Sequence, residues 1–191
     1  MRTDKDELMH FLSNKINGKR FEHSVNTAKE AVALSSIYGA DKEKAYIAGL
    51  LHDVAKGLPP DVLKNIAVNN NITVDKYEND NPELLHGKIS AVIVSRELGI
   101  TDEDILCAIR WHTTGRAGMS LLEKIIYLAD VIEPSREFKE IKRLRETAYK
   151  DIDAAMVMGL ADAIKYVKSR GFTLHPRSIE AYNDLKKREE K

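Results

Sequence analysis

Ala48-Gly49-Leu50-Leu51-His52-Asp53-Val54-Ala55-Lys56 is an apolar segment with two polar residues inside it. Its apolar positions recur at spacings of three and four, which is typical of a buried helix. Burial of His52 and Asp53 is costly unless partners satisfy both side chains. The segment therefore predicts a core helix that carries a polar site.

Helical spacing recurs along the rest of the chain, and few alternating runs suggest strands. We therefore expect an all-α fold, a single compact helical bundle with a polar pocket between its helices. The stretch from Asn69 to Pro82, rich in Asn and Asp, predicts a loop. Ser120-Leu121-Leu122-Glu123 has the form of a capping box and predicts a helix start. Helices are expected near residues 4–17, 20–38, 41–55, 60–70, 86–98, 102–112, 120–133, 138–149, 151–170 and 176–189.

Composition narrows the class of protein. Thirty basic and thirty acidic residues give no net charge, so the broad electrostatic attraction behind non-specific nucleic-acid binding is not expected. No apolar run approaches the roughly 20 residues of a membrane span, and the first residues lack a signal-peptide pattern, so we expect a cytoplasmic protein without membrane contact. The single cysteine, Cys107, lies in an apolar run and is expected in the core, not as a nucleophile.

Four histidines and two aspartates form the candidate site. Neutral imidazole with carboxylate suits Fe, Mn, Co or Zn, and six such groups could hold one or two of these ions. A carboxylate such as Asp53 could bridge two ions. The candidate residues are His23, His52, Asp53, His86, His112 and Asp130.

Asp130 gives the strongest single indication of a buried cation. It lies in Ile125-Ile126-Tyr127-Leu128-Ala129-Asp130-Val131-Ile132, and an unpaired charge in such an apolar helix is costly. The alternative is that each polar group finds a separate partner, whereas one metal cluster satisfies all of them. Lys56, three and four residues after Asp53 and His52, lies on the same helix side and could reach a phosphate beside the metal.

These residues resemble the signature of the HD-domain metal-dependent phosphohydrolase superfamily. Three stretches, at residues 48–56, at His112-Thr113-Thr114-Gly115, and at Ala129-Asp130-Val131-Ile132-Glu133-Pro134-Ser135-Arg136, are similar to the YqeK family of bacterial symmetrical diadenosine tetraphosphate hydrolases. The resemblance covers nearly the whole chain. It implies one HD domain over residues 1–191, with a core of about 18–135 and a helical extension of about 136–191.

The resemblance implies a bis(5'-nucleosyl)-tetraphosphatase that cleaves diadenosine tetraphosphate into two ADP by attack of a metal-bound hydroxide. The expected cofactor is iron or a similar transition metal, as one or two ions. The resemblance carries over His23, His52, Asp53 and Asp130 as metal ligands, with Asp53 orienting or deprotonating the water. His86 and His112 either complete a second metal site or contact substrate phosphates, and these alternatives stay open.

Substrate contacts are implied for further residues. Lys56 and Arg136 are expected to neutralise phosphate charge, and Thr113, Thr114 and Gly115 to add hydroxyl and backbone donors. Near the C-terminus, Phe172, His175 or Arg177 either contacts the nucleoside or belongs to a helix-connecting loop. The catalytic candidates are thus Asp53, Lys56, His86 and His112, and the substrate-binding candidates are His23, Lys56, His86, His112, Thr113, Arg136, His175 and Arg177.

Other functions are compatible with the same ligands. Another HD phosphohydrolase, such as a nucleotidase or a cyclic-nucleotide phosphodiesterase, would keep the metal cluster and differ in its products. An HD oxygenase would consume oxygen, and a non-catalytic nucleotide-binding helical module would bind without turnover. The expected partner is a small nucleotide, and the amphipathic stretch from Ile152 to Val167 leaves a homodimer face and an intramolecular core as alternatives.

Overall fold

A computed structural model describes residues 4–189, and every regular element in that range is a helix, which confirms the all-α fold. In chain order the elements are α1 (Lys5–Lys15), α2 (Gly18–Tyr38), α3 (Lys42–Leu51), α4 (Pro60–Asn69), α5 (Lys76–Asp80), the 3₁₀ helix η1 (Pro82–Leu85), α6 (His86–Leu98), α7 (Glu103–Trp111), α8 (Leu121–Ile132), α9 (Ile141–Ala148), α10 (Ile152–Ser169) and α11 (Pro176–Glu189).

All ten predicted helices form, but the predicted loop from Asn69 to Pro82 was wrong in part. Its second half contains α5 and the start of η1. The Asp75 side chain accepts the Glu78 N–H and the Glu78 side chain accepts the Asp75 N–H, a reciprocal cap that stabilises this short helix despite its Asn and Asp content. The third helix ends at Leu51, four residues before its predicted end, and His52 is its C-cap.

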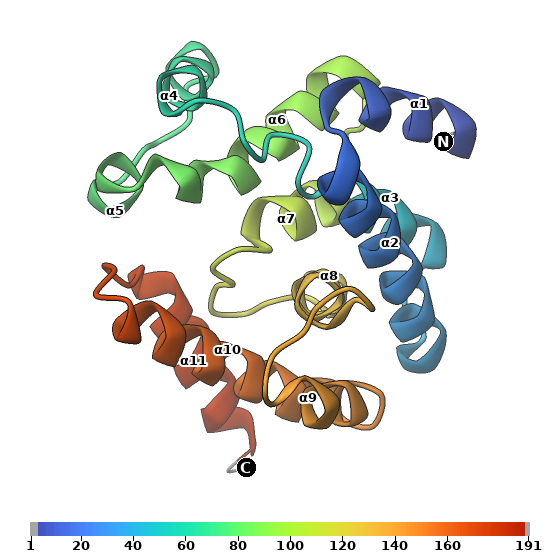
Figure 1. The fold of residues 1–191 in the computed structure, drawn as a ribbon, viewed down its shortest axis with the longest axis vertical. Helices are drawn as coiled ribbons and strands as arrows, with labels where there is room; N and C mark the ends of the chain where they lie inside the picture. Colours follow the sequence, from blue (N-terminus) through green and yellow to red (C-terminus); the bar gives the residue numbers. More distant parts are fainter. Residues whose placement is uncertain (1–3, 190–191) are drawn as a thin grey trace.

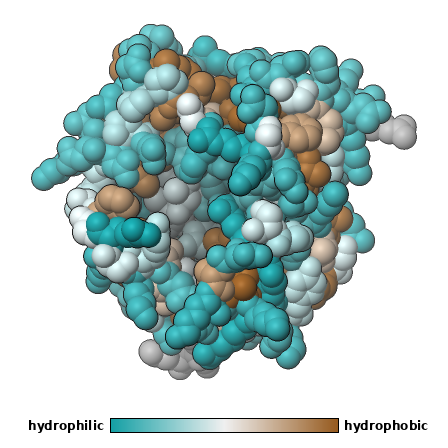
Figure 2. Space-filling view, viewed as in Figure 1, coloured by the Kyte–Doolittle hydropathy of each residue, from teal (hydrophilic) through white to brown (hydrophobic). Residues whose placement is uncertain are grey.

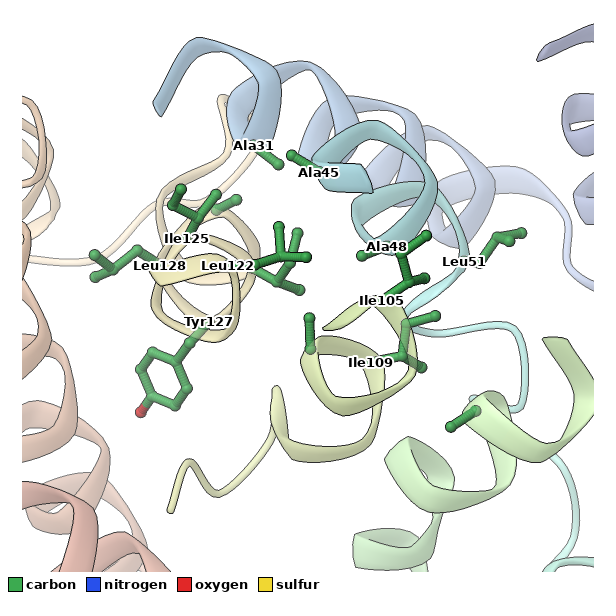
Figure 3. Close-up of a cluster of buried hydrophobic side chains, with 14 of the residues drawn as sticks. Ala31, Ala45, Ala48, Leu51, Ile105, Ile109, Leu122, Ile125, Tyr127 and Leu128 are labelled. Atoms are coloured by element: carbon green, nitrogen blue, oxygen red, sulfur yellow. The ribbon is translucent and has the colours of Figure 1, made fainter. Parts of the chain in front are cut away.

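Helix α8 forms the centre of the molecule, seen nearly end-on in Figure 1 with other helices around it. It packs against α2, α3, α7 and α10. Figure 3 shows Leu122 and Ile125 of α8 extending toward Ala31 and Ala45 of the two neighbouring helices. The predicted capping box at Ser120 is confirmed, because the Ser120 hydroxyl accepts the Glu123 N–H and the Glu123 carboxylate accepts the Ser120 N–H.

Two glycines allow pairs of helices to approach closely. A Cβ on Gly49 of α3 would lie 2.9 Å from the Ala28 Cα of α2. A Cβ on Gly87 of α6 would lie 2.8 Å from the Arg110 carbonyl oxygen of α7. Real Cβ atoms do not approach backbone this closely, so glycine sets both helix separations. Each glycine lies within three residues of a candidate histidine, His52 or His86.

The C-terminal helices cover the remaining side of α8. Helix α10 packs against α8, α9 and α11. Within residues 4–189, no helix combines the length and apolar character needed to cross a membrane. On the face in Figure 2, hydrophilic side chains separate several smaller hydrophobic patches. Cys107, expected in the core, is only partly buried.

Candidate metal centre

Five helices bring the six candidate residues to one point. Three of these residues stand at helix ends, where side chains can converge without collisions between helix bodies. His52 and His112 are the C-cap residues of α3 and α7, and His86 is the first residue of α6. His23 lies within α2, and Asp130 lies near the end of α8.

One half of the cluster consists of His23, His52 and Asp130, with one oxygen of Asp53. The Nε2 atom of His23 lies 3.3 Å from His52 Nε2 and 3.0 Å from Asp130 Oδ1. Asp53 Oδ2 lies 3.6 Å from His52 Nε2 and 4.0 Å from His23 Nε2. We call this group the His23 subsite.

The other half consists of His86, His112 and the second oxygen of Asp53. The two Nε2 atoms lie 3.0 Å apart. Asp53 Oδ1 lies 3.2 Å from His86 Nε2 and 3.3 Å from His112 Nε2. We call this group the His86 subsite. Asp53 faces both subsites, one oxygen toward each.

Each imidazole is fixed by its Nδ1 atom. His52 donates to the Gly49 carbonyl at 2.8 Å, His86 to the Glu83 carbonyl at 2.6 Å, His112 to the Ile109 carbonyl at 2.7 Å, and His23 to the Glu133 carboxylate at 3.1 Å. A carbonyl oxygen only accepts, so Nδ1 of His52, His86 and His112 carries a proton, and Nε2 of each of these rings faces the cluster. This arrangement presents imidazoles as metal ligands.

The donor set fits a divalent cation. Asp53 Oδ1 is buried without a hydrogen-bond partner and lies 3.2 Å from His86 Nε2 and 3.3 Å from His112 Nε2. A cation would satisfy the oxygen and both nitrogens together. Adjacent ligand atoms about 2.0–2.1 Å from one ion in tetrahedral or octahedral geometry are roughly 2.8–3.4 Å apart. The shortest spacings in both subsites, 3.0–3.3 Å, lie in that range.

Protonation also favours metal binding. Burial lowers the pKa of His52 to about 4 and lowers the pKa of His86, which keeps both rings neutral. Burial opposes ionisation of Asp53 and Asp130, yet the neighbouring imidazoles hold the pKa of each carboxyl well below its usual range. Burial lowers the pKa of His23, but Asp130 and Glu133 outweigh it and raise the pKa. A positive charge is therefore favoured beside these carboxylates.

A basic cleft opens beside the cluster, with a volume of about 360 Å³. Lys56 Nζ lies 3.3 Å from His86 Nε2, and Arg136 Nη2 donates to Asp130 Oδ1 at 2.6 Å. Lys19 and Arg20 also line the cleft and were missed by the sequence interpretation. They lie four and three residues before His23 on α2, so the helical period could have placed them on the same face.

The threonines differ in their surroundings. Thr113 Oγ1 lies 3.1 Å from His86 Nε2 and 3.2 Å from His112 Nε2, so its hydroxyl stands at the His86 subsite. The Thr114 hydroxyl is buried and donates to the Gly115 carbonyl oxygen at 2.9 Å. Of the two threonines, Thr113 is therefore better placed to donate a hydrogen bond to a ligand in the site.

His175 and Arg177 lie in a separate ion network. His175 Nε2 and Arg177 Nη2 contact Asp75 Oδ2 at 2.9 and 2.8 Å, and Arg177 Nη1 contacts Glu78 Oε1 at 2.9 Å. Lys88 Nζ also donates to Glu78 at 2.8 Å. These contacts attach the C-terminal segment to α5. A nucleoside contact by His175 or Arg177 stays a prediction.

The family follows from comparison with known proteins. Residues 20–135 match the HD domain family. This chain belongs to that family. A symmetrical bis(5'-nucleosyl)-tetraphosphatase of Bacillus subtilis is 36% identical, over 95% of this chain and 97% of its own. Its Staphylococcus aureus counterpart is 33% identical over 88% of each chain. In an HD domain protein, the His-Asp cluster implies a divalent metal.

A solved structure gives the same fold. It is the crystal structure of a predicted HD superfamily hydrolase involved in NAD metabolism from Clostridium acetobutylicum. The two chains are 44% identical, with a TM-score of 0.94 over 97% of this chain and 98% of the other. The helix arrangement around the cluster is therefore also found in this solved HD superfamily protein.

Proposed function

We propose that this protein hydrolyses diadenosine tetraphosphate symmetrically into two ADP, with iron or a similar transition metal as cofactor. The observation that carries the proposal is Asp53, whose two oxygens face two sets of histidine nitrogens beside a basic cleft. The HD domain relatives that are named symmetrical bis(5'-nucleosyl)-tetraphosphatases support the choice of substrate.

The proposed ligands are divided between the two subsites. His23, His52 and Asp130 would hold one ion, and His86 and His112 a second, with Asp53 between them. A bound divalent ion supplies water activation near neutral pH and neutralises phosphoryl charge. Because Asp53 lies between the two subsites, it would orient the attacking water or accept its proton.

Cationic side chains flank both subsites. Lys56 stands beside His86, Arg136 stands beside Asp130, and both side chains line the cleft. A tetraphosphate cleaved at its central bridge has two phosphates on either side, so one cation is available to each half. The Arg136 guanidinium would give a directional contact and Lys56 a point charge, while Thr113 donates a hydrogen bond to a phosphate oxygen.

Product analysis tests the proposal. The protein is stripped of metal, reloaded with Fe, Mn, Co or Zn without oxygen, and incubated with diadenosine tetraphosphate before chromatography. Two ADP per substrate are expected from wild type, and turnover by Asp53→Asn should be lower by a factor of at least about 100. Asp61→Asn is the matched control, since Asp61 is exposed in the first turn of α4.

The products distinguish the other functions. ATP plus AMP would exclude the symmetrical assignment and keep the hydrolase, and oxygen consumption would indicate an oxygenase. Binding without turnover for every metal would indicate a nucleotide-binding module. NAD belongs in the same assay, because the Clostridium acetobutylicum hydrolase is described as involved in NAD metabolism.

A further inference from the structure

Glu133 was given no role by the sequence interpretation, yet it contacts a candidate ligand directly. His52, His86 and His112 each donate from Nδ1 to the backbone carbonyl three residues earlier. His23 lies inside the 21-residue helix α2, where the nearby carbonyls accept the N–H groups of the helix. Its Nδ1 donates instead to Glu133 Oε1 at 3.1 Å. Among the four histidines of the cluster, His23 is thus the one whose Nδ1 atom has an anionic partner.

Glu133 occupies an unfavourable place for a carboxylate. It is the C-cap of α8 and 0% exposed. Burial penalises its charge, and so does the negative end of the helix dipole. The Ser135 N–H donates to the carboxylate at 2.8 Å, and the Ser135 hydroxyl also donates to it. Arg136 Nε lies 3.6 Å from the carboxylate, and Arg145 Nη2 donates to the Glu133 backbone carbonyl at 2.7 Å. A cation reached through His23 would offset the remaining cost.

The two subsites differ in charge as a result. The His23 subsite contains Asp130 and receives the charge of Glu133 through His23, and the Arg136 guanidinium, 2.6 Å from Asp130 Oδ1, offsets only one of these two negative charges. The His86 subsite has backbone carbonyls behind both histidines and the Lys56 ammonium 3.3 Å from His86 Nε2. Asp53 contributes one oxygen to each. The His23 subsite is therefore the more negative of the two.

We propose that Glu133 is a positioning residue that gives the His23 subsite the higher metal affinity, so that the first ion binds there and the second binds more weakly at the His86 subsite. This inference rests on the metal requirement of the proposed function. A carboxylate behind a histidine ligand fixes the ring and raises the basicity of its other nitrogen. Loss of such a partner typically weakens metal binding about 10–100-fold.

Titration of the metal-stripped full-length protein with Co²⁺ tests the proposal, with absorption spectra and a competing chelator to resolve the two affinities. Glu133→Gln keeps the size and the hydrogen-bond acceptor but removes the charge. We expect the first Co²⁺ to bind about 10–100-fold more weakly and the second to change little. Glu123→Gln is the control, because Glu123 is 1% exposed on the same helix but pairs with Arg116.

Glu133→Asp distinguishes charge from shape. It keeps the charge and shortens the side chain, so it should retain more first-ion affinity than Glu133→Gln. If Glu133→Gln instead binds the first ion more tightly than Glu133→Asp, the side chain acts by packing alone and the proposal is overturned. Equal first-ion affinity in Glu133→Gln and wild type also overturns it. If Glu133→Gln does not fold, Glu133→Asp is compared with His23→Gln. The proposal is overturned if these two variants bind the first ion equally weakly. Absence of Co²⁺ binding by wild type would overturn the proposed function as well, whereas unchanged affinity in a metal-binding variant overturns only this inference.

Discussion

The turn after Asp53 depends on Gly57 and on an arginine from α2. Gly57 has a φ of +88°, and a Cβ built on it would lie 1.6 Å from Arg20 Nη1. That nitrogen donates to the Lys56 carbonyl oxygen at 2.8 Å. In Gly57→Ala the positive φ costs about 1–2 kcal/mol, and displacement of Arg20 forfeits an exposed hydrogen bond of about 1 kcal/mol. We expect a loss of about 2–3 kcal/mol in the free energy of unfolding.

Urea unfolding of a double-mutant cycle measures the two contributions separately. In an Arg20→Ala background, Gly57→Ala should cost only the backbone part, so the coupling energy is about 1 kcal/mol. Gly39→Ala is the control, because Gly39 has a φ of +73° and nothing within 4 Å of its built Cβ. An equal cost of Gly57→Ala with and without Arg20 would refute the reasoning.

Three further perturbations have defined outcomes. Glu78→Gln breaks a buried ion pair with Lys88 and should destabilise the protein by about 3–5 kcal/mol at neutral pH. Burial opposes the ionisation of Glu78, but its cationic partners lower its pKa. The ionised side chain therefore stabilises the fold above the ordinary carboxyl pKa, and this stability is lost as the pH falls from there through the lowered pKa of the folded protein. Unfolding curves at several pH values should show this dependence in wild type and not in Glu78→Gln. Gly87→Ala should push α6 from the Arg110 carbonyl and, because His86 is the adjacent residue, lower the metal content found by metal analysis. Ser120→Ala removes the α8 cap and should lower stability by about 1 kcal/mol in urea unfolding.

The cluster was predictable because its residues are expensive to bury. Asp130 and the His52-Asp53 pair stand in apolar stretches of sequence, and one metal cluster explains them together. The structure brings them within ligand distance of each other. Lys56 was predicted on the ligand side from a helix that in fact ends at Leu51, and the turn places it beside His86 all the same.

Partners distant in the chain could not be read from spacing. His23 and Glu133 are 110 residues apart, and no local period relates α2 to the end of α8. His175 and Asp75 are 100 residues apart, so the sequence near His175 gave no sign of this partner. In the structure His175 contacts Asp75, the N-cap of α5. Helix α5 itself was missed because its stability comes from one reciprocal cap and not from helix propensity.

The helix ends explain why this cluster can be rigid before a metal binds. Carbonyls in the last turn of a helix lack an intrahelical N–H. Gly49 and Ile109 lie in the last turns of α3 and α7, and their carbonyls accept the Nδ1–H of His52 and His112. One hydrogen bond thus caps the helix and aims the imidazole. A histidine at the C-cap is fixed by its own helix, whereas a histidine inside a helix, such as His23, needs a partner from elsewhere. That difference makes the two subsites unequal in construction and is the physical reason to expect two unequal metal affinities.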